Sequence, residues 1–294
     1  MAAPLVGDQR QGVMALGAGR SFFKMSGSGN DFIFFDCRSE PCEELRRPEI
    51  IRALCARGVG VGADGIVLLE PSTSADFSMT YFNSDGSLAS LCGNASLCAV
   101  SLAAAVGGAG AEVTRIETGS GLLTGRLRDG TAEIDLQPVS GVKSDAGIGP
   151  LIGERRVGFA RAGVPHLVVL CEDVDRVDLG PGGRGASLRQ HEAISPEGAN
   201  VNFVSAGPAA TGGWRMRTFE RGVEAETLAC GSGAVATAIL LSVWKVADPG
   251  GLVVLETRSG RTLGVSLRRS GDSWYPSLRG EGRLVFSGVL KDLM

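Results

Sequence analysis

The sequence predicts an α/β protein made of two similar domains, each with a sheet packed around one central helix. Three observations predict this fold. The chain has 294 residues, more than the roughly 100 to 200 of a usual single domain. Its 44 glycines cluster in short turn-like knots between strand-like runs, and one segment of the first half recurs weakly in the second half.

Strand-like runs outnumber helical ones. Runs rich in β-branched and aromatic residues are expected to form strands at residues 32–36, 66–70, 77–82, 114–118, 131–136, 167–171, 201–204, 214–219, 252–257 and 283–286. Helical periodicity is clearest at residues 48–56, after Ser96, around residues 173–179 and after Ala234.

The repeat fixes the domain organisation that we expect. Residues 82–99 read FNSDGSLASLCGNASLCA, and residues 219–236 read FERGVEAETLACGSGAVA. In each, a Phe ends a strand, a polar loop follows, and a Cys-Gly pair opens a helix of small residues. We therefore expect an N-terminal domain at 21–136, completed by a C-terminal strand at 283–294. A C-terminal domain should cover 137–282, and residues 1–20 should form a disordered extension.

Composition excludes several classes of protein. A formal net charge of -3 provides no basic field for nucleic acid. No apolar run reaches the 18 or so residues of a membrane span, and no signal peptide is evident. We expect a cytoplasmic protein with a small-molecule partner, and a homodimer is left open. The seven cysteines are scattered, without a CxxC pair, so we expect reduced thiols and neither a disulfide framework nor a zinc site.

The two Cys-Gly pairs are the strongest candidates for chemistry. Cys92 and Cys230 each stand at a predicted helix start. A helix N-terminus is expected to lower a cysteine pKa and to offer unpaired N–H groups to an anion. Gly93 and Gly231 would let a substrate approach the backbone closely. Each site thus predicts a thiolate base beside a carboxylate-binding cradle.

If the two sites meet, their thiols face each other across one carbon atom. Removing the weakly acidic α-proton of an amino acid needs a positioned base and stabilisation of the charge that grows on the carboxylate. One thiolate would take the proton from one face, and the opposite thiol would deliver another proton to the other face. This chemistry inverts a stereocentre, and it needs neither pyridoxal phosphate nor another cofactor.

The chain resembles the diaminopimelate epimerase family over nearly its whole length. The motifs are FFKMSGSGNDFIFFD from Phe22, GVGADGIVLL, FNSDGS, CGN, GVPH, GANVNFV, FERG and ETLACGSGA ending at Ala234. The resemblance implies two pseudosymmetric domains with mostly antiparallel sheets and an active site in the cleft between them. It also implies a cofactor-independent, two-base isomerase of lysine and peptidoglycan precursor biosynthesis that interconverts LL- and meso-diaminopimelate.

The resemblance also assigns site residues. Cys92 and Cys230 match the catalytic pair. The arginine of the substrate-binding Glu-Arg pair is expected to clamp a distal carboxylate, and a histidine near the site has an open role. The matching positions are Asn30, Asn83, Asn200, Glu220 and Arg221 for the substrate, Gly93, Asn94, Gly231 and Ser232 for the reacting carboxylate, and His166.

Two departures from the family pattern keep alternatives open. Val164 stands where the family usually has Asn, and Leu97 stands where it usually has Arg. A racemase of the same family acting on another amino acid, such as histidine, is therefore the second hypothesis. A non-catalytic binding paralogue and a thiol-disulfide redox protein are the other two, and the two retained cysteines disfavour the first of these.

Other patterns have structural interpretations. Gly60, Gly62 and Gly65 spell GxGxxG but precede a strand, the reverse of the dinucleotide-binding order. Asp64 and Asp85 are expected to cap turns. Arg184 and Arg189 are expected on a solvated loop. Cys98 should point into the core, and Cys37, Cys42, Cys55 and Cys171 should be ordinary thiols.

Overall fold

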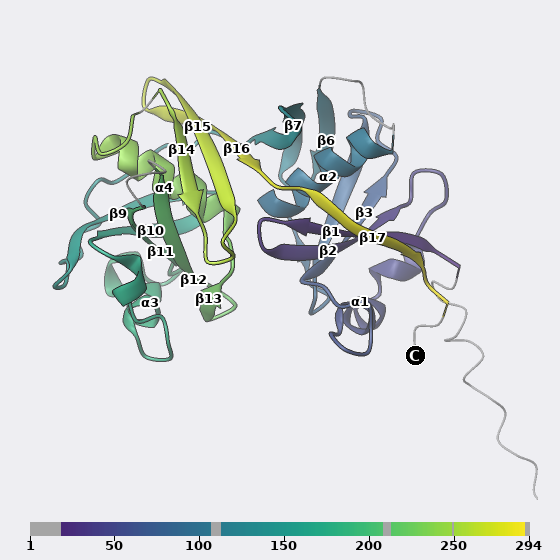
Figure 1. The fold of residues 1–294 in the computed structure, drawn as a ribbon, viewed down its shortest axis with the longest axis horizontal. Helices are drawn as coiled ribbons and strands as arrows, with labels where there is room; N and C mark the ends of the chain where they lie inside the picture. The colour runs from purple at the N-terminus through teal and green to yellow at the C-terminus, as the bar shows by residue number, and fades with distance from the viewer. Residues whose placement is uncertain (1–18, 107–112, 208–212, 249, 292–294) are drawn as a thin grey trace, which may run out of the picture.

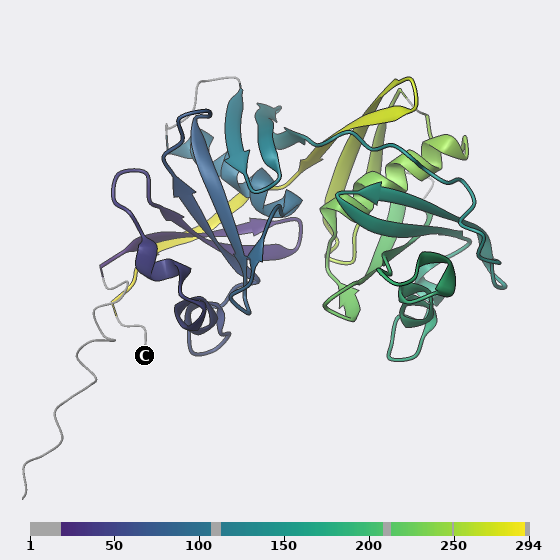
Figure 2. The same cartoon turned by 180° about the vertical axis from the view of Figure 1, so that it is seen from behind.

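The structure, a computed structural model, describes residues 19–106, 113–207, 213–248 and 250–291. It has two lobes that lie side by side, and long strands near the C-terminus connect them (Figure 1). Seventeen strands lie in one hydrogen-bonded network. The same arrangement seen from behind shows that each lobe carries one central helix, α2 in the first and α4 in the second (Figure 2).

The first lobe is built from the first half of the chain. Its elements are β1 (Ser21–Gly27), β2 (Asn30–Asp36), α1 (Pro48–Cys55), β3 (Gly65–Glu70), β4 (Phe77–Asn83), β5 (Leu88–Ala89), α2 (Gly93–Ala105), β6 (Thr114–Thr118), β7 (Gly121–Arg128) and β8 (Thr131–Asp135). The pair β2–β3 is parallel, as is β4–β6, and the other neighbours within this series are antiparallel.

The second half repeats this order element by element. Its elements are β9 (Glu154–Ala162), β10 (Val164–Cys171), α3 (Arg184–Arg189), β11 (Asn200–Ala206), β12 (Trp214–Glu220), β13 (Ala225–Thr227), α4 (Gly231–Val243), β14 (Leu252–Glu256), β15 (Thr262–Ser270) and β16 (Ser273–Gly280). Here β10–β11 and β12–β14 are the parallel pairs. The predicted pseudosymmetric α/β fold, with mostly antiparallel sheets, is confirmed.

One strand links the lobes through its pairing. β16 pairs with β15 on one side and with β8 of the first lobe on the other. β17 (Arg283–Val289) follows it and pairs with β1 in the first lobe (Figure 1). Because strand pairing continues from one lobe to the other through β16, the domain limits stay a prediction.

The central helices form the core of each lobe. α2 packs against β1, β7, β8, β16 and β17, and α4 packs against β9, β10, β11, β15 and β16. Both helices are composed of small and apolar residues on nearly all sides and are mostly buried. A helix that is apolar all round needs to be enclosed, which explains why each sheet wraps around its helix.

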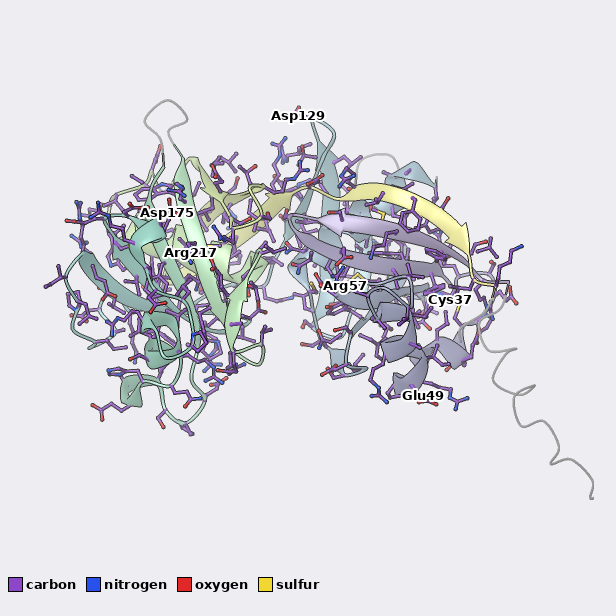
Figure 3. The ribbon with its side chains drawn as sticks, turned by 60° about the horizontal axis from the view of Figure 1, so that its bottom comes forward. Cys37, Glu49, Arg57, Asp129, Asp175 and Arg217 are labelled. Atoms are coloured by element: carbon purple, nitrogen blue, oxygen red, sulfur yellow. A yellow bond between two sulfur atoms is a disulfide. The ribbon has the colours of Figure 1, made fainter. Side chains whose placement is uncertain are left out.

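Two segments differ from the sequence expectation. Residues 173–179 form only a 3₁₀ turn, Val174–Arg176. The Arg217 guanidinium donates to the carbonyls of Val174 (2.8 Å) and Val177 (2.9 Å), which a longer helix would use for its own hydrogen bonds. Figure 3 shows Arg217 and Asp175 close together on this lobe. Arg184 and Arg189 belong to helix α3 and not to a solvated loop, and Arg184 binds both carboxylate oxygens of Glu154, at 2.8 and 2.9 Å.

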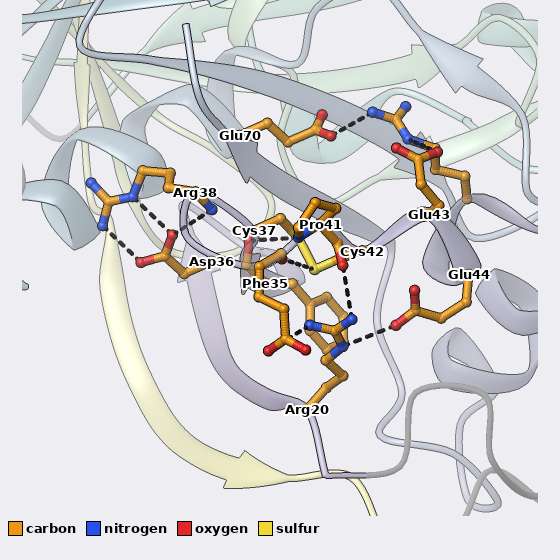
Figure 4. Close-up of a disulfide and its surroundings, with 12 residues drawn as sticks. Arg20, Phe35, Asp36, Cys37, Arg38, Pro41, Cys42, Glu43, Glu44 and Glu70 are labelled. Carbon is orange, nitrogen blue, oxygen red and sulfur yellow. Dashed lines mark hydrogen bonds and ion pairs between the residues drawn. A yellow bond between two sulfur atoms is a disulfide. The ribbon is translucent and has the colours of Figure 1, made fainter.

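The expectation that all cysteines are free thiols is wrong for one pair. Cys37 and Cys42 form a disulfide five positions apart, and both are buried in a hydrophobic cluster of the first lobe. Beside it, Arg20 donates to the carbonyl of Pro41 at 2.8 Å and to Glu44 at 2.9 Å (Figure 4). The short turn between the two cysteines brings the thiols together, a local pairing that has no sequence motif.

The N-terminal extension is only partly within the structure. Residues 1–18 of the expected extension 1–20 lie outside the described residues. Gly19 donates to the carbonyl of Leu290 at 2.6 Å, and Arg20 accepts from Leu290 N–H at 2.9 Å, so these two positions continue the pairing of β1 with β17. No helix in the described part of the chain is both long and apolar enough to cross a membrane.

One buried leucine joins the two lobes, and its truncation tests this packing. Leu278 on β16 is fully buried and lies at the starts of both central helices. Leu278→Ala should lower the free energy of unfolding by about 2 to 5 kcal/mol, measured by denaturant titration in reducing buffer. Leu284→Ala, at an exposed position of β17, is the matched control and should change it by less than about 0.5 kcal/mol. Equal effects would contradict this role of Leu278.

Candidate active site

The starts of the two central helices meet between the lobes. Cys92 caps α2 with φ −132° and ψ 114°, and Cys230 caps α4 with φ −135° and ψ 109°. A Cβ atom added to Gly93 would lie 3.9 Å from the Cα of Gly231, and one added to Gly231 would lie 3.8 Å from the Cα of Gly93. The two helix N-termini are thus nearly in contact, and the tighter neighbour of either added Cβ is Leu278 Cδ2, at 3.1 Å from the one on Gly93 and 3.0 Å from the one on Gly231.

A cavity of about 390 Å³ opens at this meeting point, and residues of both lobes line it. Nine of the predicted site residues line it: Asn30, Asn83, Cys92, Gly93, Asn94, Glu220, Cys230, Gly231 and Ser232. Val164, the position that departs from the family pattern, lines it too. Asn200, Arg221 and His166 are not among the lining residues.

A directional chain of amides ends at the α2 side of the cavity. Asn30 Nδ2 donates to the Asp64 carboxylate at 3.0 Å, and Asn94 Nδ2 donates to Asn30 Oδ1 at 2.7 Å. The carboxylate can only accept, so it fixes the orientation of both amides. Asn94 Oδ1 is left as a buried acceptor without a partner in the described part of the chain.

Arg221 lies behind the cavity and is engaged elsewhere. Its Nη1 donates to the carboxylate and the backbone carbonyl of Glu197, both at 3.3 Å. Its backbone N–H donates to Asn200 Oδ1 at 2.7 Å. Asn200 thus holds the turn that carries Arg221, and Glu197 engages one nitrogen of its guanidinium group.

The His166 ring is fully buried and lies behind Ser232. Its Nε2 is 3.1 Å from Ser232 Oγ, and its Nδ1 is 3.1 Å from Asn202 Nδ2. Burial, with the charge of Arg221, lowers the pKa of His166 to about 3, so the ring is neutral at physiological pH.

The expected lowering of the two cysteine pKa values is wrong for this structure. Burial raises the pKa of Cys92 to about 11 and that of Cys230 to about 12, and the Glu220 carboxylate raises both further. Backbone N–H groups of the helix starts oppose the shift, as does Ser232 at Cys230. Desolvation therefore exceeds the effect of the helix N-termini, and both thiols are protonated near neutral pH.

Sequence reasoning missed several residues around the site. Phe32 and Tyr81 line the cavity, and their rings pack edge to face at 5.8 Å between centroids. Asn202 and Thr218 support His166 from behind. The signal for Asn202 was present in the motif NVNFV, where a second polar residue interrupts a buried strand.

The GxGxxG segment runs into β3, and Asp85 caps its own turn at Ser87.

The raised thiol pKa values predict how the free protein reacts with iodoacetamide. Because only the thiolate reacts, alkylation of Cys92 and Cys230 should accelerate about tenfold per pH unit from pH 7 to pH 9.5. The rates are measured by mass spectrometry on Cys92→Ser and Cys230→Ser, so that each thiol is followed alone. A rate that is independent of pH in this range would mean that the pKa values are lowered, as the helix starts alone would predict.

The chain matches known proteins in sequence. The diaminopimelate epimerase family model matches residues 22–141 and 158–271. A diaminopimelate epimerase of Gemmatimonas aurantiaca is 51% identical over 93% of this chain and 100% of its own length. One of Aquifex aeolicus is 39% identical over 92% of this chain and 98% of its own length.

Solved structures show the same fold at low identity. A phenazine biosynthesis protein of the PhzF family from Bacillus anthracis has a TM-score of 0.68 at 16% identity, covering 92% of this chain and 98% of its own. A hydroxyproline epimerase from Agrobacterium vitis has a TM-score of 0.62 at 18% identity, covering 93% of each chain. With two facing Cys-Gly helix starts and a family match over most of its length, this chain belongs to the diaminopimelate epimerase family.

Proposed function

We propose that this protein interconverts LL- and meso-diaminopimelate, with Cys92 and Cys230 as the two acid-base groups. The observation that carries the proposal is the meeting of two cysteine-capped helix starts at one cavity, with Gly93 and Gly231 in contact distance. The substrate is inferred from the relatives, which are named diaminopimelate epimerases. The scheme uses no cofactor.

The reaction is a proton transfer on each face of one carbon. A thiolate on one side takes the α-proton and becomes a thiol, while the electron pair of the broken C–H bond passes into the carboxylate. The thiol on the opposite side then gives its proton to the α-carbon and becomes a thiolate. The product is the opposite stereoisomer, and the two cysteines have exchanged protonation states.

The helix starts stabilise the charge that the reaction creates. Each helix N-terminus carries about half a positive elementary charge and unpaired N–H groups. Two of them at one cavity favour a carboxylate, and they favour it more as its charge grows. Asn94 Oδ1, the unpartnered acceptor, suits the α-ammonium of the same substrate.

The far end of the substrate is assigned to Arg221, which does not itself line the cavity but follows the lining residue Glu220. Arg221 suits the distal carboxylate because guanidinium binds carboxylate with two parallel hydrogen bonds. In the structure Arg221 pairs with the Glu197 carboxylate, at 3.3 Å. We propose that the distal carboxylate replaces Glu197 as the partner of Arg221.

A second candidate function rests on Val164. This apolar side chain lines the cavity and makes no hydrogen bond to a distal ammonium, so a racemase that acts on another amino acid, such as histidine, is the alternative substrate assignment. A binding paralogue and a redox protein have less support, because neither needs two cysteine-capped helix starts at one cavity. We also propose a cytoplasmic location, and a homodimer stays a prediction that sedimentation would test.

Proton exchange in D₂O tests the proposed function directly. Under reducing conditions, LL-diaminopimelate should lose its α-proton NMR signal while the meso isomer forms. A panel of single amino acids, including histidine, lysine and glutamate, is the comparison and should exchange far more slowly. Exchange with another amino acid alone would establish the racemase instead, and no exchange with any would favour the binding paralogue.

Each cysteine should be essential for inversion. Cys92→Ser and Cys230→Ser are each expected to lower the epimerisation rate by about 10² to 10⁴-fold, because one face then loses its acid-base group. Cys98→Ala, on the same helix as Cys92 but buried in the core, is the matched control and should retain activity. An unchanged rate in either serine variant would refute the two-thiol scheme.

The role of Arg221 is tested through substrate affinity. Arg221→Lys should raise KM for diaminopimelate about tenfold or more, because Lys cannot form the two parallel bonds to a carboxylate. Glu197→Gln should lower KM, because it frees Arg221 from its competing carboxylate. A KM that is unaffected by both changes would indicate a substrate that does not reach Arg221.

A further inference from the structure

The pseudosymmetry of the lobes shows which residues occupy equivalent places. In the first lobe, Phe32 pairs with Gly65 at the start of the parallel β2–β3 ladder. In the second lobe, His166 pairs with Asn200 at the start of β10–β11. His166 is therefore the counterpart of Phe32.

Two further counterparts follow from the same registers. Val67 pairs with Phe34 and with Tyr81 in the first lobe. Asn202 pairs with Val168 and with Thr218 in the second. Asn202 thus replaces Val67, and Thr218 replaces Tyr81.

The second lobe buries three polar residues where the first lobe has two apolar residues, Phe32 and Val67, and one tyrosine, Tyr81. His166, Asn202 and Thr218 are all at most 2% exposed. Burying polar side chains costs free energy unless they are hydrogen-bonded. Their presence on one side only suggests a role that Cys230 requires and Cys92 does not.

The polar residues form one continuous chain of hydrogen bonds that leads to Cys230. Thr218 Oγ1 donates to Asn202 Oδ1 at 3.0 Å, and Asn202 Nδ2 lies 3.1 Å from His166 Nδ1. His166 Nε2 lies 3.1 Å from Ser232 Oγ, which lies 3.6 Å from Cys230 Sγ.

The backbone fixes the direction of this chain. Asn202 Nδ2 also donates to the carbonyl of Leu167, at 3.1 Å, so the amide nitrogen must face that side. His166 Nδ1, on the same side, then has to accept, because an amide nitrogen does not. The ring proton therefore resides on Nε2 and is donated to Ser232 Oγ, which leaves the Ser232 hydroxyl proton for Cys230.

We propose that His166, Asn202 and Thr218 are positioning residues that fix the Ser232 hydroxyl as a hydrogen-bond donor to the sulfur of Cys230. His166 does not exchange protons with the substrate. The chain favours the thiolate form of Cys230, and Cys92 has no equivalent, since Phe32, Val67 and Tyr81 stand in the corresponding places. That the thiolate matters for turnover rests on the proposed function.

Neighbouring groups also shift the pKa values of His166 and Cys230, at the two ends of this contact through Ser232. Arg221 is the charged group that acts on His166, and with burial it keeps the pKa of the ring at about 3. Glu220 and Cys92 raise the pKa of Cys230. Ser232 and the N–H of Gly233, which donates to Cys230 Sγ at 3.4 Å, are the groups that oppose them.

The tautomer of His166 can be measured without substrate. The chain has two histidines, His166 and His191, so ¹⁵N-histidine labelling gives only two rings to resolve, and His191→Gln assigns them. Long-range ¹H–¹⁵N NMR should show His166 with its proton on Nε2 and without titration from pH 5 to pH 9. A proton on Nδ1, or titration in this range, would overturn the proposal.

Asn202→Val tests the connection to Cys230. Valine is the residue of the first lobe at this place, and it removes the donor to His166 Nδ1. Followed in the Cys92→Ser background, alkylation of Cys230 by iodoacetamide at pH 8.5 should slow about threefold to tenfold. Followed in the Cys230→Ser background, alkylation of Cys92 should be unchanged.

Thr218→Val is a second variant in case Asn202→Val fails to fold, and circular dichroism checks both. A folded variant with an unchanged Cys230 rate, or equal slowing of both cysteines, would overturn the proposal. The outcome is separate from that of the proposed function: a protein with the Nε2 tautomer and a slowed Cys230 but no epimerisation supports the chain of hydrogen bonds and refutes only the activity.

Discussion

The close approach of two helix N-termini is the constraint on which the rest of the structure depends. The positive ends of two helix dipoles repel each other. Here they meet at Gly93 and Gly231, where a Cβ atom added to either glycine would lie within 3.9 Å of the Cα of the other. An anion between them turns this repulsion into attraction at both ends. Leu278, from the strand that links the lobes, packs under both helix starts. The continuous strand network thus holds two like dipole ends together, an arrangement that the carboxylate of the proposed substrate would stabilise.

The two lobes present opposite hydrogen-bonding functions to the cavity. On the α2 side, the carboxylate of Asp64 orients Asn30 and Asn94, and the chain ends in an acceptor. On the α4 side, the Leu167 carbonyl orients Asn202 and the chain ends in a donor at Ser232. An amino acid has both a cationic and an anionic group, and the proposed reaction leaves a thiolate as well. A duplicated fold can therefore serve an asymmetric ligand when a few buried positions diverge.

The sequence allowed most of the fold to be predicted, together with nine of the residues that line the cavity, because the signals for them are local. The repeated Cys-Gly starts and the strand-like runs are local patterns, and they located both central helices and most strands. The disulfide of Cys37 and Cys42 and the role of Arg184 depend on contacts between side chains brought together only by folding. The polar residues around Asn202 could not be found in this way, because only the strand register shows that His166 and Asn202 occupy the places of Phe32 and Val67 in the first lobe.

The pKa values show why local reasoning about the thiols gave the wrong sign. A helix start acts over a few ångströms and favours the thiolate, whereas enclosure by two lobes removes the water that would solvate it. A thiolate formed despite a raised pKa is a stronger base, which suits the weakly acidic α-proton. In the proposed function the substrate brings an ammonium group beside the sulfur atoms, and a nearby cation lowers a thiol pKa. Ionisation of the thiol is thereby coupled to binding, so the reactive form is favoured when a substrate is present to use it.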